Sequence, residues 1–249
     1  MIVAPGPLPN KLFQPSWSED GHHFCYMSSA VDPPPPGGTP TTLNLGGVGL
    51  PSRAVAEVGM RFEMAGVGVA AGSLHNDRAI VVSATRTWAI QLSSGRVLWT
   101  RTANSTGPAV HYFVASPDGR FVADNSVPCC PIGVSVGSAT LIGPDGTALA
   151  TVPGWVHGFS WNGSLVVVST AVDEKGVQVL NRATLNPVWS APNDLKWART
   201  ATDPTNGGHV AVGVSPTGAY AGSDGFQAAY DLHVIEATGK AYLLHGQVR

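Results

Sequence analysis

In the segment VHYFVASPDGRFVADNS (110–126), the turn SPDG joins two runs that are rich in β-branched and aromatic residues. Aspartate followed by glycine is typical of a tight turn, because the Asp side chain caps the backbone and Gly accepts a positive φ. β-Branched and aromatic residues favour extended strands. The segment therefore predicts two antiparallel strands joined by a short turn.

This turn returns at intervals along the chain, each time before another apolar run. The four further copies are WSEDG (17–21), LHNDR (74–78), WNGS (161–164) and SPTG (215–218). The equivalent positions in the five turns are Asp20, Asp77, Asp118, Asn162 and Thr217, separated by 57, 41, 44 and 55 residues. Two of these intervals match the roughly 40–45 residues of a four-stranded propeller blade, and the other two leave room for insertions.

Each copy continues with a second pair of short strands. The clearest pair is TWAIQL (87–92) and VLWTRT (97–102), joined by the turn SSGR, in which Gly95 can adopt the positive φ of a hairpin. In the fourth copy PVWSAP (187–192) takes the place of VLWTRT. We therefore expect Trp99 and Trp189 at equivalent positions in fourth strands.

The repeats predict an all-β fold, a β-propeller of about five four-stranded blades that occupies residues 1–249 as a single domain. Five copies fit either a complete five-bladed ring or part of a larger one. A ring usually closes by sharing one blade between the two chain ends, because an open ring exposes sheet edges. The segment available for such an exchange is MIVAP (1–5).

The turns resemble those of known propeller families. WSEDG and SPDG are similar to the WSPDG turn between the first two strands of TolB-type repeats, and AIQLSSGRVLW (89–99) resembles the A-x-D-x-x-T-G-x-x-x-W repeat of quinoprotein-like propellers. The WD-repeat signature is missing, since the chain has no Trp-Asp dipeptide. The resemblance implies the propeller architecture, which proteins with unrelated activities share, so it implies no particular function.

Composition narrows the classes of function. Of the 249 residues, 43% are hydrophobic and only 12% are charged, with a net charge of −2. Fourteen Lys and Arg residues are too few for the basic surface that nucleic acids require. No apolar run is long enough for a transmembrane helix, and the first residues lack a signal-peptide pattern. The expected location is cytoplasmic if Met1 is the true start, and extracytoplasmic if an upstream signal or anchor is missing.

Long segments identify the expected binding face. Three of them join second and third strands, namely AVDPPPPGGTP (30–40), SVPCCPIGVSVG (126–137) and GSDGFQAAYD (222–231), and NDLKWARTATDPTNGG (193–208) connects two copies. These connections lie at one end of a propeller, and long loops on a rigid scaffold tend to carry recognition. The side chains expected to contact a protein or small ligand there are Trp197, Arg199, Asp224, Phe226 and Tyr230. The alternative for each is packing beneath its own loop.

Cys129 and Cys130 are a further candidate pair. Adjacent cysteines can form a strained vicinal disulfide, and the alcohol dehydrogenases among quinoprotein propellers carry such a pair over the quinone. The resemblance to those enzymes is partial, because they form a longer, eight-bladed ring. Their calcium-ligand and catalytic-aspartate motifs have no match in this sequence. Three roles stay open for the pair: two reduced and packed thiols, a redox or soft-metal site, and quinone binding.

The carboxylates form no recognisable catalytic or metal motif. Asp20, Asp118 and Asp145 precede Gly in tight turns, so a capping role is expected for them. Glu63 and Asp124 are the only carboxylates considered for acid–base chemistry, and the sequence does not bring them together. Four further aspartates lack the spacing of a calcium loop: Asp194, Asp203, Asp224 and Asp231. We expect no metal and no cofactor.

The leading functional hypothesis is a non-catalytic propeller that serves as a binding or scaffold protein through its loop-rich face. It rests on insertions confined to one side and on the lack of a recognisable catalytic constellation. The alternatives are an enzyme, quinoprotein-like or a hydrolase, that acts on a small molecule or saccharide in the propeller channel, and a degenerate propeller fragment. Polar groups that converge in the channel would favour the enzyme.

Overall fold

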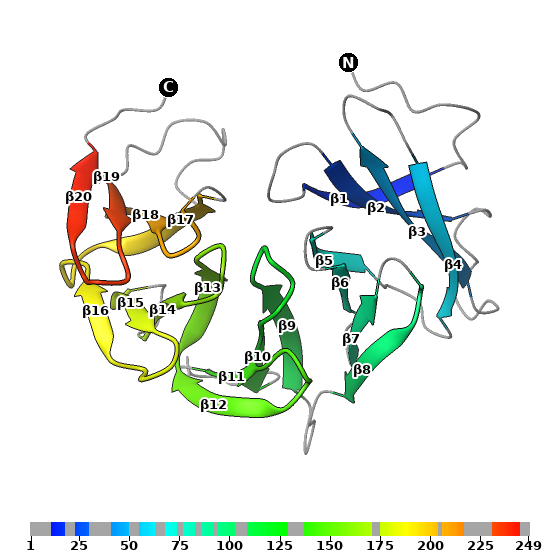
Figure 1. Ribbon diagram of the computed structural model, residues 1–249. Helices are drawn as coiled ribbons and strands as arrows, with labels where there is room; N and C mark the ends of the chain where they lie inside the picture. Colours follow the sequence, from blue (N-terminus) through cyan, green and yellow to red (C-terminus); the bar gives the residue numbers. More distant parts are fainter. Residues whose placement is uncertain are drawn as a thin grey trace. The chain divides into compact units, whose positions relative to one another are not determined.

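The computed structural model describes residues 11–17, 23–29, 41–49, 55–62, 68–73, 77–82, 86–91, 94–102, 109–128, 137–170, 175–203, 206–216 and 231–244. These residues form strands and turns (Figure 1). Over these ranges we found no helix with the length and apolar character needed to cross a membrane. The predicted all-β fold is confirmed.

The described strands form five four-stranded antiparallel sheets, and within each sheet neighbouring strands are consecutive in the chain. The chain also divides into two compact units. The first comprises Met1–Asn104 with Pro144–Gly146, and the second comprises Ser105–Gly143 with Thr147–Arg249. A single domain over 1–249 stays a prediction.

The first unit holds two of the sheets. The first sheet consists of β1 (Lys11–Trp17), β2 (His23–Ser29), β3 (Thr41–Gly49) and β4 (Val55–Phe62). The second sheet consists of β5 (Gly68–Ser73), β6 (Arg78–Val82), β7 (Arg86–Gln91) and β8 (Val97–Thr102). Gly95 in the turn between β7 and β8 has a φ of 68°, so the predicted hairpin and its glycine are confirmed.

The second unit holds the other three sheets. The third sheet consists of β9 (Ala109–Ala115), β10 (Val122–Pro128), β11 (Ser138–Ile142) and β12 (Ala148–Pro153). The fourth consists of β13 (Trp155–Phe159), β14 (Leu165–Ser169), β15 (Val177–Asn181) and β16 (Pro187–Ser190). The fifth consists of β17 (Lys196–Thr202), β18 (Val210–Ser215), β19 (Asp231–Ile235) and β20 (Ala241–Leu244). Figure 1 shows the first strands β9, β13 and β17 on one side of this unit and the fourth strands β12, β16 and β20 on the other.

The fourth sheet packs against both other sheets of the second unit, and this explains its sequence. All five residues of β14 are buried. Val166 and Val168 belong to a core cluster shared with the third sheet, whereas Leu165 and Val167 belong to a cluster shared with the fifth sheet. A strand that is covered on both faces needs apolar side chains throughout, so LVVVS shows no alternation.

Two of the repeated turns have the same hydrogen bonds. Between β9 and β10, the Ser116 hydroxyl donates to Asp118 Oδ1 at 2.6 Å and accepts from the amide five residues later at 2.9 Å. Between β13 and β14, the Ser160 hydroxyl donates to Asn162 Oδ1 at 3.1 Å and again accepts from the amide five residues later at 2.9 Å. Asp118 is 3% exposed and also accepts from the Arg120 amide, so its predicted capping role is confirmed.

The turns of successive sheets in the second unit are hydrogen-bonded to one another. The Asp118 amide donates to the Trp161 carbonyl at 3.3 Å, and the Asn162 amide donates to the Gly207 carbonyl at 3.0 Å. Gly207 lies between β17 and β18. The first-to-second-strand turns of the three sheets therefore form one continuous row.

The position predicted for the fifth copy of the repeat is wrong. SPTG (215–218) does not join a first and a second strand, because Ser215 is the last residue of β18. The turn between β17 and β18 contains the sequence NGGH (206–209) instead, and His209 N donates to Asn206 O at 2.9 Å. The turn therefore lacks the Ser-x-Asp-Gly or Ser-x-Asn-Gly sequence that marks the turns at Asp118 and Asn162. Thr217 lies outside the described residues.

Trp99 and Trp189 occupy equivalent positions, as predicted. Each is the third residue of a fourth strand, and each lies beside a register shift in the pairing with the third strand. Both rings are covered within their own unit. Trp99 Nε1 donates to the Pro144 carbonyl at 2.9 Å, and Trp189 packs against His233 with ring centroids 4.9 Å apart.

Candidate functional site

β17 carries two of the residues that the sequence singles out, Trp197 and Arg199. They lie in a strand, because only residues 191–195 separate β16 from β17. The prediction of a long connection over 193–208 is therefore wrong. KWARTAT (196–202) contains strand-favouring Trp and Thr and neither Gly nor Pro, which explains why it pairs with β18.

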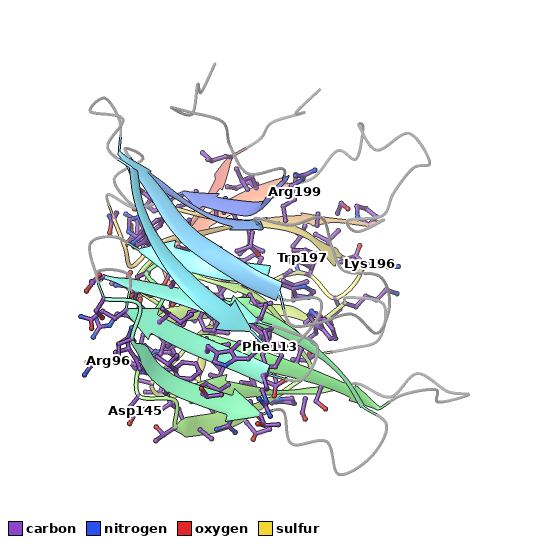
Figure 2. The ribbon with its side chains drawn as sticks, turned by 90° about the vertical axis from the view of Figure 1, so that its right-hand side faces the viewer. Arg96, Phe113, Asp145, Lys196, Trp197 and Arg199 are labelled. Carbon is purple, nitrogen blue, oxygen red and sulfur yellow. The ribbon has the colours of Figure 1, made fainter. Side chains whose placement is uncertain are left out.

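A β-bulge shapes this part of β17. The pairing with β18 shifts register between Trp197 and Arg199. A bulge bends its strand and changes the direction of the side chains beside it. Ala198 is buried, Trp197 is half-buried and Arg199 is exposed. Trp197 pairs with Val214 and Arg199 with Gly213, so the indole and the guanidinium lie on opposite faces of this edge strand; Figure 2 labels both side chains.

The indole of Trp197 is fixed by two contacts. Its Nε1–H donates to Thr200 Oγ1 at 3.0 Å. Its ring stacks on the imidazole of His157, with ring centroids 4.1 Å apart and planes inclined by 13°. Thr200 packs against Gly158, where an added Cβ would lie 2.9 Å from Thr200 Cγ2. The indole is therefore held in one position by the fold itself.

His157 lies at a second bulge, where the pairing of β13 with β14 shifts between Val156 and Gly158. Its Nε2 atom is hydrogen-bonded to the Ser169 hydroxyl at 2.8 Å. Burial lowers the pKa of His157 from 6.5 to about 3. The imidazole is therefore neutral at pH 7 and stacks on Trp197 in that form.

The Ser169–His157 pair resembles a nucleophile with its general base, but it lacks the properties of one. Ser169 is 2% exposed, so a substrate carbonyl cannot reach its hydroxyl. A base with a pKa of about 3 is a weak proton acceptor near neutral pH. We therefore assign the pair to the packing of β13 against β17.

Acidification should destabilise the protein through His157. The unfolded imidazole takes up a proton near pH 6.5, whereas the folded one resists protonation down to about pH 3, so the His157 contribution is complete above 6.5 and is lost below it. Between pH 6.5 and 4.5 we expect this residue to remove about 2 kcal/mol from the free energy of unfolding. Urea unfolding at both values measures the loss.

The matched variants separate His157 from other titrating groups. His157→Gln retains a hydrogen-bonding side chain without a titrating group, so it should lose less stability than the wild type over the same interval. His209→Gln, in the turn between β17 and β18, should behave as the wild type. Equal losses in the wild type and in His157→Gln would show that the buried imidazole is not the cause.

Three cations lie around the start of β17. Lys175 forms an isolated antiparallel bridge with Lys196, the first residue of β17. Both lysines are half-buried, and Arg199 is exposed. No ion pair of these three side chains occurs within the ranges that the structure describes. We refer to Lys175, Lys196, Trp197 and Arg199 as the Trp197 surface.

The other predicted site residues give no second site. Asp124 lies inside β10 opposite Phe113 and is 6% exposed. Among the residues described, no three His, Cys, Asp or Glu side chains gather in a way that could hold a metal ion. The following candidates lie outside the described residues: Glu63, Cys129, Cys130, Asp224, Phe226 and Tyr230. The roles predicted for them stay predictions.

Sequence reasoning missed three residues of this region. His157 interrupts the apolar run WVHGF (155–159), which is a weak signal that a polar group sits in a core strand. Lys175 and Lys196 are brought together by a bridge between the fourth and fifth sheets. No local sequence pattern reveals such a contact.

Similar arrangements of sheets occur in solved structures of other proteins. No protein-family model matches the sequence, and no curated protein matches it significantly. An oligogalacturonate lyase in complex with manganese is 12% identical, with a TM-score of 0.53 over 93% of this chain and 64% of the lyase chain. A chain of the Mitotic Checkpoint Complex is 11% identical, with a TM-score of 0.51 over 98% of this chain and 79% of its own.

A third similar structure is a TolB-like protein of Agrobacterium tumefaciens, 12% identical, with a TM-score of 0.50 over 95% of this chain and 81% of its own. At such identities these likenesses show the fold alone. The fold is that of a β-propeller, and the predicted likeness to TolB-type propellers is confirmed. Whether five sheets make a complete ring or part of a larger one stays a prediction.

Proposed function

We propose that this β-propeller is a non-catalytic domain that binds a protein partner through the Trp197 surface. The observation that carries the proposal is the edge strand β17, which carries the exposed guanidinium of Arg199 on one face and the immobilised, half-buried indole of Trp197 on the other. Trp and Arg are enriched among the residues that contribute most to protein–protein affinity. The partner would meet them on a strand of the second unit.

The fixed position of the indole favours affinity. Binding costs less conformational entropy when a contact side chain is already ordered. Trp197 is ordered by its stacking on His157 and by its hydrogen bond to Thr200. Arg199 lies two residues further along this edge strand and is exposed, so it can reach a partner without rearrangement of the sheet.

Comparison with known proteins is consistent with a binding role. One of the similar structures belongs to the Mitotic Checkpoint Complex, so the propeller fold is used there within an assembly of proteins. A propeller scaffold supports many functions, and the proposal for this chain rests on the Trp197 surface.

Charge removal on this surface tests the proposal. The purified chain is crosslinked in a lysate of its source cells, the captured protein is identified by mass spectrometry, and its affinity is measured with purified components. Lys196→Ala combined with Arg199→Ala should weaken the affinity at least about tenfold, because both cations would contact the partner. Arg120→Ala removes an exposed cation in the turn between β9 and β10 and should leave the affinity unchanged.

Two outcomes would contradict the proposal. A purified partner that binds the double variant as tightly as the wild type would place the interface elsewhere. Failure to enrich any protein over a mock capture would argue against a protein-binding role. Circular dichroism of each variant shows whether its fold is intact before affinities are compared.

A further inference from the structure

Resting on the proposed function, we infer that the segment bound by the Trp197 surface is an acidic peptide segment, whose Asp or Glu carboxylates lie between Lys175, Lys196 and Arg199. The inference names the chemistry of the partner, not its identity. It follows from the way in which the fold places three cations.

The bridge between Lys175 and Lys196 is the first observation. The two residues lie directly opposite each other in an antiparallel pairing that links the fourth and fifth sheets. Opposed residues project to the same side of such a pairing, and like charges at these positions repel. A bound carboxylate between the two ammonium groups would turn this repulsion into attraction.

Arg199 is the second observation. Its guanidinium is exposed three residues along β17 from Lys196. A guanidinium group presents parallel N–H donors that match the two oxygens of a carboxylate. Lys196 pairs with Ser215 and Arg199 with Gly213, so the bulge brings both cations to the same face of β17, whereas the indole of Trp197 faces the fourth sheet.

The charge of the whole chain favours a short acidic segment over a long polyanion. The net charge is −2, so the cations form a local patch and not a basic face. Nucleic-acid binding draws on many phosphate contacts spread over such a face. The carboxylate of Asp194, exposed two residues before Lys196, belongs to the same region and opposes the binding of an anion.

The experiment uses two synthetic octapeptides of alternating composition, one of Gly and Glu and one of Gly and Gln, titrated into the full chain by isothermal calorimetry at low salt. We expect the Glu peptide to bind and the Gln peptide to bind at least about tenfold more weakly. Affinity for the Glu peptide should fall as salt is raised, because exposed charges are screened.

Variants of opposite sign sharpen the test. Lys196→Ala with Arg199→Ala should reduce the affinity for the Glu peptide about tenfold or more, and Asp194→Asn should raise it two- to threefold, about the effect of removing one screened charge. Arg120→Ala is the matched control for loss of a cation and should have no effect. Lys175→Ala should weaken binding less than the double variant.

Three results would overturn the inference: equal affinity for the two peptides, no effect of Asp194→Asn together with no effect of the double variant, or tighter binding of a 20-nucleotide single-stranded DNA than of the Glu peptide. Failure here is distinguishable from failure of the proposed function. A captured partner whose binding depends on Lys196 and Arg199, but which is not displaced by the Glu peptide, would retain the binding role and exclude the acidic segment.

Discussion

Gly154→Ala is expected to lower the free energy of unfolding by about 4 kcal/mol, an exceptionally large effect for the addition of one methyl group. Gly154 is the only residue between β12 and β13, and its φ is 96°. An added Cβ would overlap the backbone carbonyl oxygen of Ser169 and would lie 2.9 Å from Thr170 Cα. The neighbours are backbone atoms of β14 and its end, so no side-chain rotation can relieve the overlap.

Two other glycines separate the causes of this effect. Gly95→Ala introduces left-handed backbone strain, at a φ of 68° in a turn, and should cost about 1 kcal/mol. At Gly208 the one atom of the described residues within 4 Å of an added Cβ is Ala237 Cβ, at 4.0 Å, so Gly208→Ala should be close to neutral. Urea unfolding of the three variants gives the comparison. A loss at Gly154 no larger than that at Gly95 would show that β14 yields to the methyl group.

Asn125→Leu is expected to cost about 3 kcal/mol, because two buried backbone groups would lose their partners. The Asn125 side chain in β10 donates from Nδ2 to the Val156 carbonyl at 3.0 Å and accepts from the Val156 amide at 2.8 Å. Both residues are fully buried. The amide thus replaces a strand partner and joins the third sheet to the fourth.

Hydrogen exchange gives a residue-specific readout of this variant. The Val156 amide should lose most of its protection against exchange in Asn125→Leu. Amides in β18 should lose no more protection than the fall in global stability accounts for. Asn186→Leu alters an exposed asparagine in the turn between β15 and β16 and should change neither property. Unaltered protection at Val156 would mean that another group takes over the role of Asn125.

The sequence was sufficient for the fold where a residue acts on its immediate neighbours. The turn at Asp118 and the hairpin at Gly95 depend on contacts within a few residues, so the local sequence predicts both structures. The prediction for the fifth copy is wrong because the turn sequence and the turn lie in different places. NGGH forms the turn between the first and second strands through backbone hydrogen bonds, whereas SPTG matches the repeated sequence but begins at the last residue of a second strand.

The candidate site could be predicted only in part. Residue type alone predicts Trp197 and Arg199 as contact residues, because Trp and Arg are enriched at interfaces, but the sequence predicts a loop where the structure has the strand β17. The partners that give the indole its position, His157 and Thr200, become visible only when β13 and β17 pack together. Contacts between sheets depend on bulges and on pairing register, and neither is written in a local pattern.

The row of hydrogen-bonded turns in the second unit restricts how this chain can vary in length. A backbone amide of one turn donates a hydrogen bond to a carbonyl of the next, from Asp118 to Trp161 and from Asn162 to Gly207. One residue more in the middle turn would displace a donor and an acceptor at once, and would disturb the sheets on either side. Insertions and deletions in descendants of this sequence should therefore accumulate in the connections between second and third strands, while the turns of the row keep a constant residue count.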